Sequence, residues 1–221
     1  MIPRLMVVCV FGALAVPPLP VAAENAVPEI SMEGLELVEK DRRGEIYADP
    51  GIDWGTYDRI MLEEATVAFR KNWQRDQNRT QPFKIQTKDM ERIKSELSDL
   101  FGEVFARELA DGGYVMATET AENVLRITPH IVDLDVYAPD TRGSASRTTT
   151  YAEQAGRMTL RLDIFDAVTG DLIARASDRQ EAPRRGYMQW TTSATNRAEA
   201  QRMIQKWARE FRERLDEARG G

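Results

Sequence analysis

The sequence predicts an α+β domain of two layers, in which a mixed or antiparallel sheet of about five strands carries two helices on one face. The expected order along the chain is β-α-β-β-β-β-α. Two segments, near 87–113 and 196–218, repeat their apolar residues at the 3.6-residue spacing of a helix. Segments near 125–136 and 157–180 instead alternate apolar and polar residues, which is typical of strands with one buried face.

The first 23 residues are predicted to be a secretory signal peptide. Arg4 precedes an apolar run over residues 5–16, and small residues occupy positions 21–23 just before Glu24. This run of about a dozen residues is well short of the roughly 20 that span a bilayer. We therefore expect cleavage after Ala23 and a periplasmic mature chain without a transmembrane segment.

Cys9 is the one cysteine of the chain, and its position argues against lipid attachment. A lipoprotein acceptor cysteine follows the apolar region, whereas most of the apolar run here comes after Cys9. Cleavage after Ala23 removes it, which excludes disulfides, a thiol nucleophile and cysteine-ligated zinc. Losing Arg4 leaves 29 basic residues against 36 acidic ones, a net charge of −7 that disfavours nucleic-acid binding.

Residues 24–57 are expected to form an extended N-terminal arm, followed by a single α+β domain over residues 58–219. The arm mixes polar residues, proline and glycine with short apolar pieces, and a Pro-Gly pair favours a turn within it. Trp54 and Tyr57 are expected to dock the end of the arm onto the core.

The first strand is predicted over residues 59–69, where β-branched and other apolar residues are frequent. A polar connection over residues 70–83 is expected to follow. The next helix has Thr87 as its expected N-cap and a Gly-Gly pair as its C-terminal stop, and residues 114–118 return as a strand. The apolar stripe of this helix comprises Ile93, Leu97, Leu100, Phe101, Val104, Phe105 and Leu109.

The stretch "ITPHIVDLDVYAPD" contains the single histidine of the chain, His130, close to Asp133 and Asp135. The apolar alternation shifts by one residue near positions 129–132, which predicts a β-bulge. We expect this shift to place the three side chains on the face away from the core. They are candidates for a metal or acid–base site. The absence of a second histidine favours a solvated strand face, with no metal, no cofactor and no catalytic residue.

A hairpin is predicted over residues 157–180, with its turn around Thr169-Gly170-Asp171. A short edge strand is expected before it, near 147–151.

The last helix is expected to open with Asn196 and Glu199 in capping-box spacing. Its predicted buried stripe comprises Ala200, Met203, Ile204, Trp207, Phe211 and Leu215. The loop before this helix concentrates arginines and aromatic residues, which commonly anchor binding surfaces. The resulting candidate contact patch comprises Arg184, Arg185, Tyr187 and Trp190.

The chain contains, in this order, the stretches "IYADPGIDWGTYDRIMLEEATVAFRKNW", "ELSDLFGEVFARELADGGY", "VLRITPHIVDLDVYAPD", "TLRLDIFDAVTGDLIARASDR" and "TNRAEAQRMIQKWAREFRERLDEAR". Together they resemble the bacterial envelope family known as domain of unknown function 3313. The resemblance covers residues 35–219 and implies location in the envelope, often with a lipoprotein leader, from which the position of Cys9 departs. The family has no established catalytic residues, so the resemblance assigns none here.

These features favour a non-catalytic periplasmic envelope accessory or protein-interaction protein, whose partners are expected to be other envelope proteins. The alternative is a metal- or carboxylate-dependent hydrolase acting on an envelope substrate. A third possibility is a carrier that holds a small ligand between the sheet and the N-terminal arm. An enclosed apolar pocket would favour the carrier, and three ligand atoms converging in a cleft would favour the hydrolase.

Overall fold

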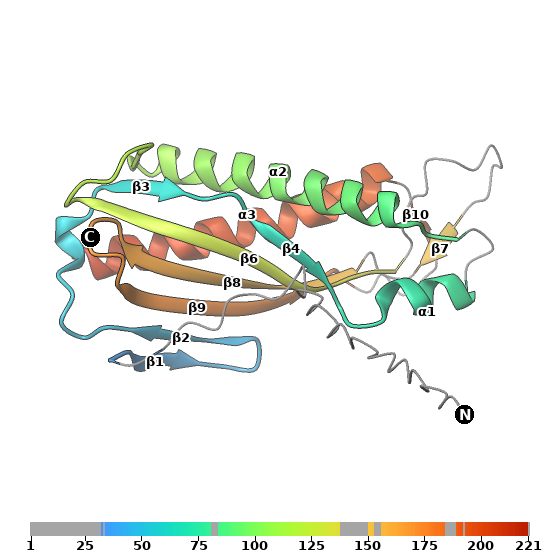
Figure 1. Cartoon of the computed structure of the whole chain (residues 1–221), viewed down its shortest axis with the longest axis horizontal. Coiled ribbons are helices and arrows are strands. Elements are labelled where there is room, and N and C mark those ends of the chain that lie inside the picture. The colour runs from blue at the N-terminus through green and yellow to red at the C-terminus, as the bar shows by residue number, and fades with distance from the viewer. Residues whose placement is uncertain are drawn as a thin grey trace, which may run out of the picture.

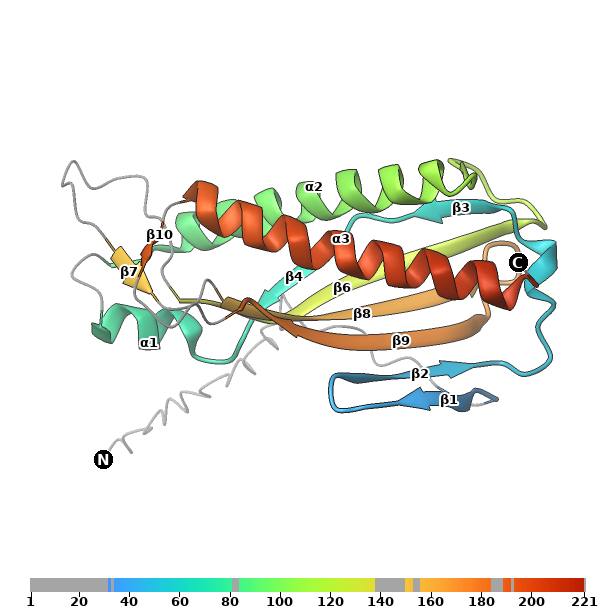
Figure 2. The ribbon, with the colours of Figure 1, turned by 180° about the vertical axis from the view of Figure 1, so that it is seen from behind.

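The structure is a computed structural model that describes residues 32, 34–80, 84–137, 150–152, 156–183, 189–191 and 193–220. Two long helices, α2 (Thr87–Asp111) and α3 (Ser193–Ala218), lie side by side on one face of a long twisted sheet (Figure 1 and Figure 2). The predicted α+β class and the placement of both helices on one face are confirmed. We call the sheet face toward the helices the inner face and the opposite one the outer face.

Eight strands of the described ranges form one mixed sheet, in the order β1-β2-β9-β8-β6-β3-β5, with β4 also paired to β6. β3 runs parallel to both β5 and β6, and β4 runs parallel to β6, whereas the other neighbours are antiparallel. The strands are β1 (Glu36–Lys40), β2 (Gly44–Ala48), β3 (Arg59–Leu62), β4 (Thr66–Phe69), β5 (Val115–Met116), β6 (Val124–Val136), β8 (Gly156–Asp166) and β9 (Leu172–Glu181). The prediction of about five strands was therefore too low.

The core lies between the two helices and the inner face of the sheet. Every member of the predicted stripe of α2 is buried except Ile93, which packs against the core from its margin. In α3, Ile204, Trp207 and Leu215 are buried. The Phe101 and Phe105 rings stack with centroids 4.1 Å apart, so the apolar spacing correctly identified the face that each helix buries.

Both helix starts differ slightly from the sequence prediction. The N-cap of α2 is Gln86, one residue before Thr87, because its backbone NH donates to the Asp89 carboxylate at 2.9 Å. α3 begins at Ser193, three residues before Asn196. The serine and threonine residues just before Asn196 are also favoured at the start of a helix. The C-terminal stop of α2 is as predicted, with Gly113 in the left-handed conformation at φ = 90°.

The predicted first strand is divided in two, because the backbone between β3 and β4 leaves the sheet ladder. The Ala65 carbonyl accepts a hydrogen bond from Ser98 Oγ of α2 at 2.7 Å. The Glu63 carboxylate accepts one from Thr128 Oγ1 of β6 at 2.6 Å. These contacts hold residues 63–65 between helix and sheet, and their side-chain partners are too distant in sequence for local periodicity to indicate.

The polar connection expected over residues 70–83 contains a helix, α1 (Trp73–Thr80). Trp73 is 1% exposed, stacks on Phe69 with ring centroids 4.1 Å apart, and donates from Nε1 to the Val136 carbonyl at 3.1 Å. This tryptophan therefore anchors α1 to the end of β6. The rest of the helix is polar, and for that reason its sequence resembles a loop.

Part of the expected N-terminal arm belongs to the sheet. β1 and β2 form a hairpin, and β2 pairs antiparallel with β9 over five residues, from Gly44 opposite Asp178 to Ala48 opposite Ala174. Gly44 is required by space, since a Cβ there would lie 1.7 Å from the Ser177 carbonyl oxygen. The arm then continues through a short 3₁₀ helix, Trp54–Thr56, to Tyr57, which is buried as predicted.

The hairpin of β8 and β9 is confirmed. Gly170 adopts φ = 76° in its turn, and the Asp166 carboxylate accepts the backbone NH groups of Val168 and Thr169. The predicted edge strand near 147–151 corresponds to β7 (Thr150–Ala152), which pairs with β10 (Gln189–Thr191) in a separate two-stranded sheet.

Candidate functional site

A cluster of charged side chains lies on the outer face at the centre of the sheet. Asp163 of β8 is completely buried, and its position between the core residues Leu162 and Ile164 turns it away from the helices. Arg175 of β9, its cross-strand neighbour, donates from Nε to Asp163 Oδ1 at 2.5 Å. Arg161 donates to the other oxygen, Oδ2, at 3.2 Å. We call these three residues with His130 the Asp163 cluster.

His130 completes the Asp163 cluster from the neighbouring strand β6. Its Nδ1 lies 2.7 Å from Thr66 Oγ1 of β4, its cross-strand neighbour, and its Nε2 lies 3.4 Å from Asp163 Oδ2. The second distance is long for a hydrogen bond. With 3% of its surface exposed, the imidazole is enclosed by the sheet and by the long side chains of the outer face.

The electrostatics of the cluster keep Asp163 ionised. Burial by itself raises the pKa of this carboxyl, but the contacts with His130 and Arg175 and the positive charges of Arg161 and Arg175 outweigh burial. Its pKa is therefore lowered from the ordinary value of 3.8. A carboxylate held in this way is a weak base, so the geometry suits a structural ion network better than proton transfer.

The structure separates the three residues that the sequence grouped together. Asp135 binds Arg70 at 2.9 Å and Arg157 at 3.2 Å, away from the partners of His130. Asp133 is exposed and has φ = 52°. The prediction of a solvated face was wrong for His130 and Asp135, which are each 3% exposed. His130 contacts Thr66 and Asp163, and arginines from β8 and from the connection after β4 pair with Asp135.

The predicted β-bulge exists but lies slightly later in β6. The register with β8 shifts between Val132 and Asp135, with Asp133 as the residue in the left-handed conformation. Aspartate tolerates this conformation better than most residues, which explains why the extra residue is placed there. His130 comes before the bulge and Asp135 after it, so the two face the same side of the sheet.

The predicted contact patch falls largely outside the described residues. Arg184, Arg185 and Tyr187 are not among them, and of Trp190 only the backbone position in β10 is described. The patch therefore stays a prediction. Across the described ranges, no group of three or more His, Cys, Asp or Glu side chains is arranged to hold a metal ion.

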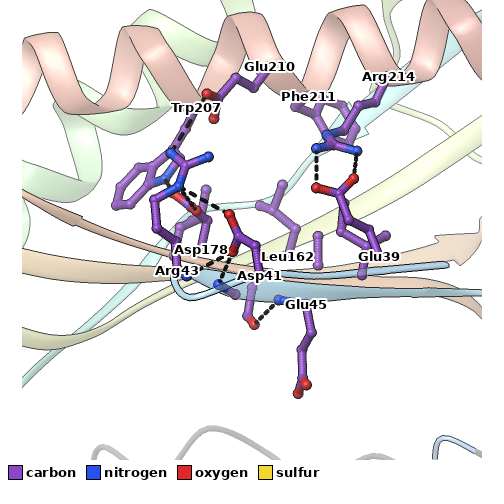
Figure 3. Close-up of a pocket in the computed structure, with 15 residues that line it drawn as sticks. Glu39, Asp41, Arg43, Glu45, Leu162, Asp178, Trp207, Glu210, Phe211 and Arg214 are labelled. Carbon is purple, nitrogen blue, oxygen red and sulfur yellow. Dashed lines mark hydrogen bonds and ion pairs between the residues drawn. The ribbon is translucent and has the colours of Figure 1, made fainter. Parts of the chain in front are cut away.

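A second candidate site is a slot on the inner side, between α3, β9 and the β1–β2 hairpin (Figure 3). It has a volume of about 80 Å³. Its apolar floor is formed by the strand residues Ile46, Leu160, Leu162 and Ala176, and Phe211 and the Trp207 ring line it from α3. The cavity lies between α3 and the sheet, at the edge where the arm contributes β1 and β2. The ligand of a carrier was expected between the sheet and the arm, so this place differs from the one expected.

Ion pairs at the rim of the slot connect the β1–β2 hairpin to α3. Arg214 of α3 forms a two-pronged pair with Glu39 of β1, at 2.6 and 3.0 Å, and these bonds lower the pKa of Glu39. Arg43 of the hairpin turn lies 3.6 Å from Asp178 and 3.9 Å from Glu210. Figure 3 shows the two groups of ion pairs on opposite sides, with Leu162 between them.

Asp178 links the slot to the core. Its Oδ2 accepts a hydrogen bond from Trp207 Nε1 at 2.7 Å, so the tryptophan ring is fixed along the slot wall. Sequence reasoning assigned Trp207 to the buried stripe of α3, which is correct, since it is 3% exposed. The sequence had no local signal for the rest of the slot, because its residues come from three segments far apart in the chain.

The Asp163 cluster did have a signal that sequence reasoning missed. A hairpin with its turn at Gly170 places Asp163 opposite Arg175, and Arg161 is two residues earlier on the same face. An acidic residue directly across from an arginine predicts a cross-strand ion pair.

Within the described residues, no helix has both the length and the apolar content that a bilayer crossing requires.

Comparison with known proteins identifies the family. A family model described as "Protein of unknown function (DUF3313)" matches residues 31–211. The chain belongs to this family. The resemblance found in the sequence is thereby confirmed, over most of the range expected. Among curated proteins, no relative matches the chain.

The chain also has distant likenesses to solved structures: the PelC dodecamer from Paraburkholderia phytofirmans, protein XCC0632 from Xanthomonas campestris and a minor lipoprotein from Acinetobacter baumannii. The identities are 9%, 10% and 11%, and the TM-scores are 0.38, 0.41 and 0.32, respectively. The matches cover 76%, 71% and 72% of this chain and 97%, 82% and 94% of the others. At these scores they carry no argument about the function of this chain.

Proposed function

We propose that this DUF3313 chain is a non-catalytic accessory protein of the bacterial envelope, and that it acts by binding another protein. The leader-like first 23 residues support a periplasmic location. The observation that carries the non-catalytic part is the Asp163 cluster. Its carboxylate is held ionised by Arg161 and Arg175. Of the acid–base candidates of the sequence, His130 lies beside this carboxylate and Asp135 is paired with two other arginines, which supports a structural role for both.

The slot supports the binding part of the proposal. It combines an apolar floor with charged groups at the rim, and the side chains of Glu39 and Arg214 are 44% and 48% exposed. Apolar floors with a few placed polar groups are the usual composition of binding sites. The volume of about 80 Å³ is small for a soluble carrier of a whole ligand, which favours an anchoring contact with a protein.

The proposal is tested by affinity purification of the tagged chain from a periplasmic extract, read by mass spectrometry. We expect one partner to be enriched reproducibly and to bind again when both proteins are purified. N-terminal sequencing of the periplasmic protein checks the location, with Glu24 as the expected first residue.

The hydrolase alternative is tested separately by isothermal titration with zinc and with manganese. Micromolar binding that disappears in a variant with both His130→Ala and Asp133→Ala would replace our proposal with a metal-dependent activity. We expect the parent and the double variant to give the same weak response, since these two side chains do not share a site.

A further inference from the structure

We propose that the slot beside α3 receives one aliphatic side chain of a partner protein, from a segment in which basic residues flank that side chain. This inference rests on the proposed function and specifies the chemistry of the partner. The evidence is the size of the slot, the sign of its charge and the exposure of its rim.

The size of the slot fits a single side chain. Its volume of about 80 Å³ is roughly half of the ~150 Å³ cavity that admits a benzene molecule. Leu160 and Leu162 in the floor are each 3% exposed. Ala176 of β9, which also lines the slot, contributes only a methyl group. A branched side chain of three or four carbons would bury its apolar surface here, with about 0.8 kcal/mol gained for each buried methylene.

The charge at the slot favours a basic partner. Five carboxylates line it against two guanidinium groups. Lys40 and Lys206, outside the lining, lie 3.1 Å from Glu45 and 3.6 Å from Glu210, so the groups at the slot carry a net charge of −1. The bases, Arg43 and Arg214, both already contact carboxylates. A lysine or arginine next to the anchoring side chain would meet the excess negative charge, whereas an anionic amphiphile such as a fatty acid would be repelled.

The rim is able to exchange its ion-pair partners. The side chains of Glu39, Arg43 and Glu210 are 44%, 42% and 36% exposed, and exposed ion pairs contribute only about 0.2–1 kcal/mol each. A basic residue of a partner therefore competes at low cost with the internal arginines. The apolar floor beneath is fixed by the sheet and by Trp207, so the cavity does not have to form on binding.

The chain's own N-terminal segment is a poor occupant. Residues 24–31 contain Glu24 and Glu29 and no basic residue, so they share the sign of the rim. A second copy of the chain is also disfavoured by the overall net charge of −6.

The experiment uses three blocked pentapeptides with the full mature chain, in isothermal titration at low ionic strength. The test peptide has one leucine with two lysines on each side. One control replaces the leucine by serine, and the other replaces the lysines by glutamates. We expect the test peptide to bind at least tenfold more tightly than either control, and to weaken as salt is added.

Matched variants place the binding in the slot. Ala176→Phe fills it and should reduce binding of the test peptide at least tenfold. Glu210→Lys reverses a charge at the rim and should weaken binding, whereas Glu213→Lys makes the same change at an exposed position of α3 outside the slot and should not. If Ala176→Phe does not fold, as judged by circular dichroism, the two charge variants decide alone.

Equal binding of the three peptides, or equal binding by the Glu210→Lys and Glu213→Lys variants, would overturn the inference. So would a concentration-dependent dimer that Ala176→Phe dissociates in analytical ultracentrifugation, because a second copy would then be the occupant. A partner purified from the envelope that binds the parent and Ala176→Phe equally would keep the proposed function and refute only the slot.

Discussion

The Asp163 cluster and the slot use the same pair of groups, arginine and carboxylate, on opposite faces of one sheet. In the cluster, Asp163 is fully buried and Arg175 has a side chain that is 14% exposed. At the slot, the corresponding values for Glu39 and Arg214 are 44% and 48%. The chemistry is the same, and the difference lies in access to water.

This difference separates an ion pair that is part of the fold from one that is open to exchange with another charged group. Removing one partner of a buried ion pair leaves a charge without compensation, which is costly, so such a pair does not open. An exposed pair is screened by solvent and costs little to exchange. The outer-face network is therefore a fixed part of the sheet, and the slot rim is an adjustable surface. Four predictions test this contrast.

The largest effect is expected from Asp163→Asn, which removes the negative charge that Arg161 and Arg175 both contact. We expect a loss of about 3–5 kcal/mol in the free energy of unfolding, measured by urea denaturation. Asp133→Asn is the matched control, because it makes the same change at an exposed position of β6, and asparagine tolerates the left-handed backbone there. Equal small losses in both variants would show that Arg161 and Arg175 do not need the Asp163 charge, and would contradict the prediction.

Acidification should remove the contribution of the same carboxylate. The pKa of Asp163 is lower in the folded chain than the ordinary value of 3.8, so its stabilisation is fully present above about pH 4 and is lost as the pH falls through the lower folded-state pKa. The stability difference between the parent and Asp163→Asn should therefore be constant above about pH 4 and should shrink as the pH falls below that value. A difference that grows on acidification would contradict this assignment.

A middle-sized effect is expected from Gly44→Ala, which tests how the slot wall is attached. The added Cβ would lie 1.7 Å from the Ser177 carbonyl oxygen, so β2 must move away from β9. We expect a loss of about 1–3 kcal/mol and faster hydrogen exchange in β1 and β2. Gly102→Ala is the control, because a Cβ there meets nothing within 4 Å, and alanine in a helix should be neutral or stabilising.

The smallest effect is expected at the slot rim. A double-mutant cycle of Glu39→Ala and Arg214→Ala should give a coupling energy of about 0.2–1 kcal/mol that decreases with salt. Thermal or urea unfolding of the four proteins at two salt concentrations measures it. A coupling near that of a buried pair, about 3 kcal/mol or more, would mean that the hairpin is locked to α3 and would count against an exchangeable rim.

Particular residues show how far the sequence could predict the site. His130, Asp133 and Asp135 were correctly found as a polar group around a bulge, because strand alternation is a local property. Their burial and their partners were not predictable in the same way, since Arg161, Thr66 and Arg70 come from other strands or from the connection after β4. The slot joins residues 39–46 to residues 160–214, and no local pattern reports a contact over that distance.

The amino-acid sequence was sufficient to predict the two amphipathic helices, the β8–β9 hairpin, the bulged strand β6 and membership of the DUF3313 family. The helices, the hairpin and the bulged strand each depend on spacing within one segment, where the period of the backbone is read directly from the side chains. The family was recognised from several stretches in a fixed order. Three further features became visible only in the fold: residues 36–48 join the sheet, Trp73 anchors a helix, and Asp163 is paired with two arginines. These outcomes depend on which strands become neighbours. That choice is made by burial of the whole core, and it determines which charges are shielded from water and which remain exposed at the slot.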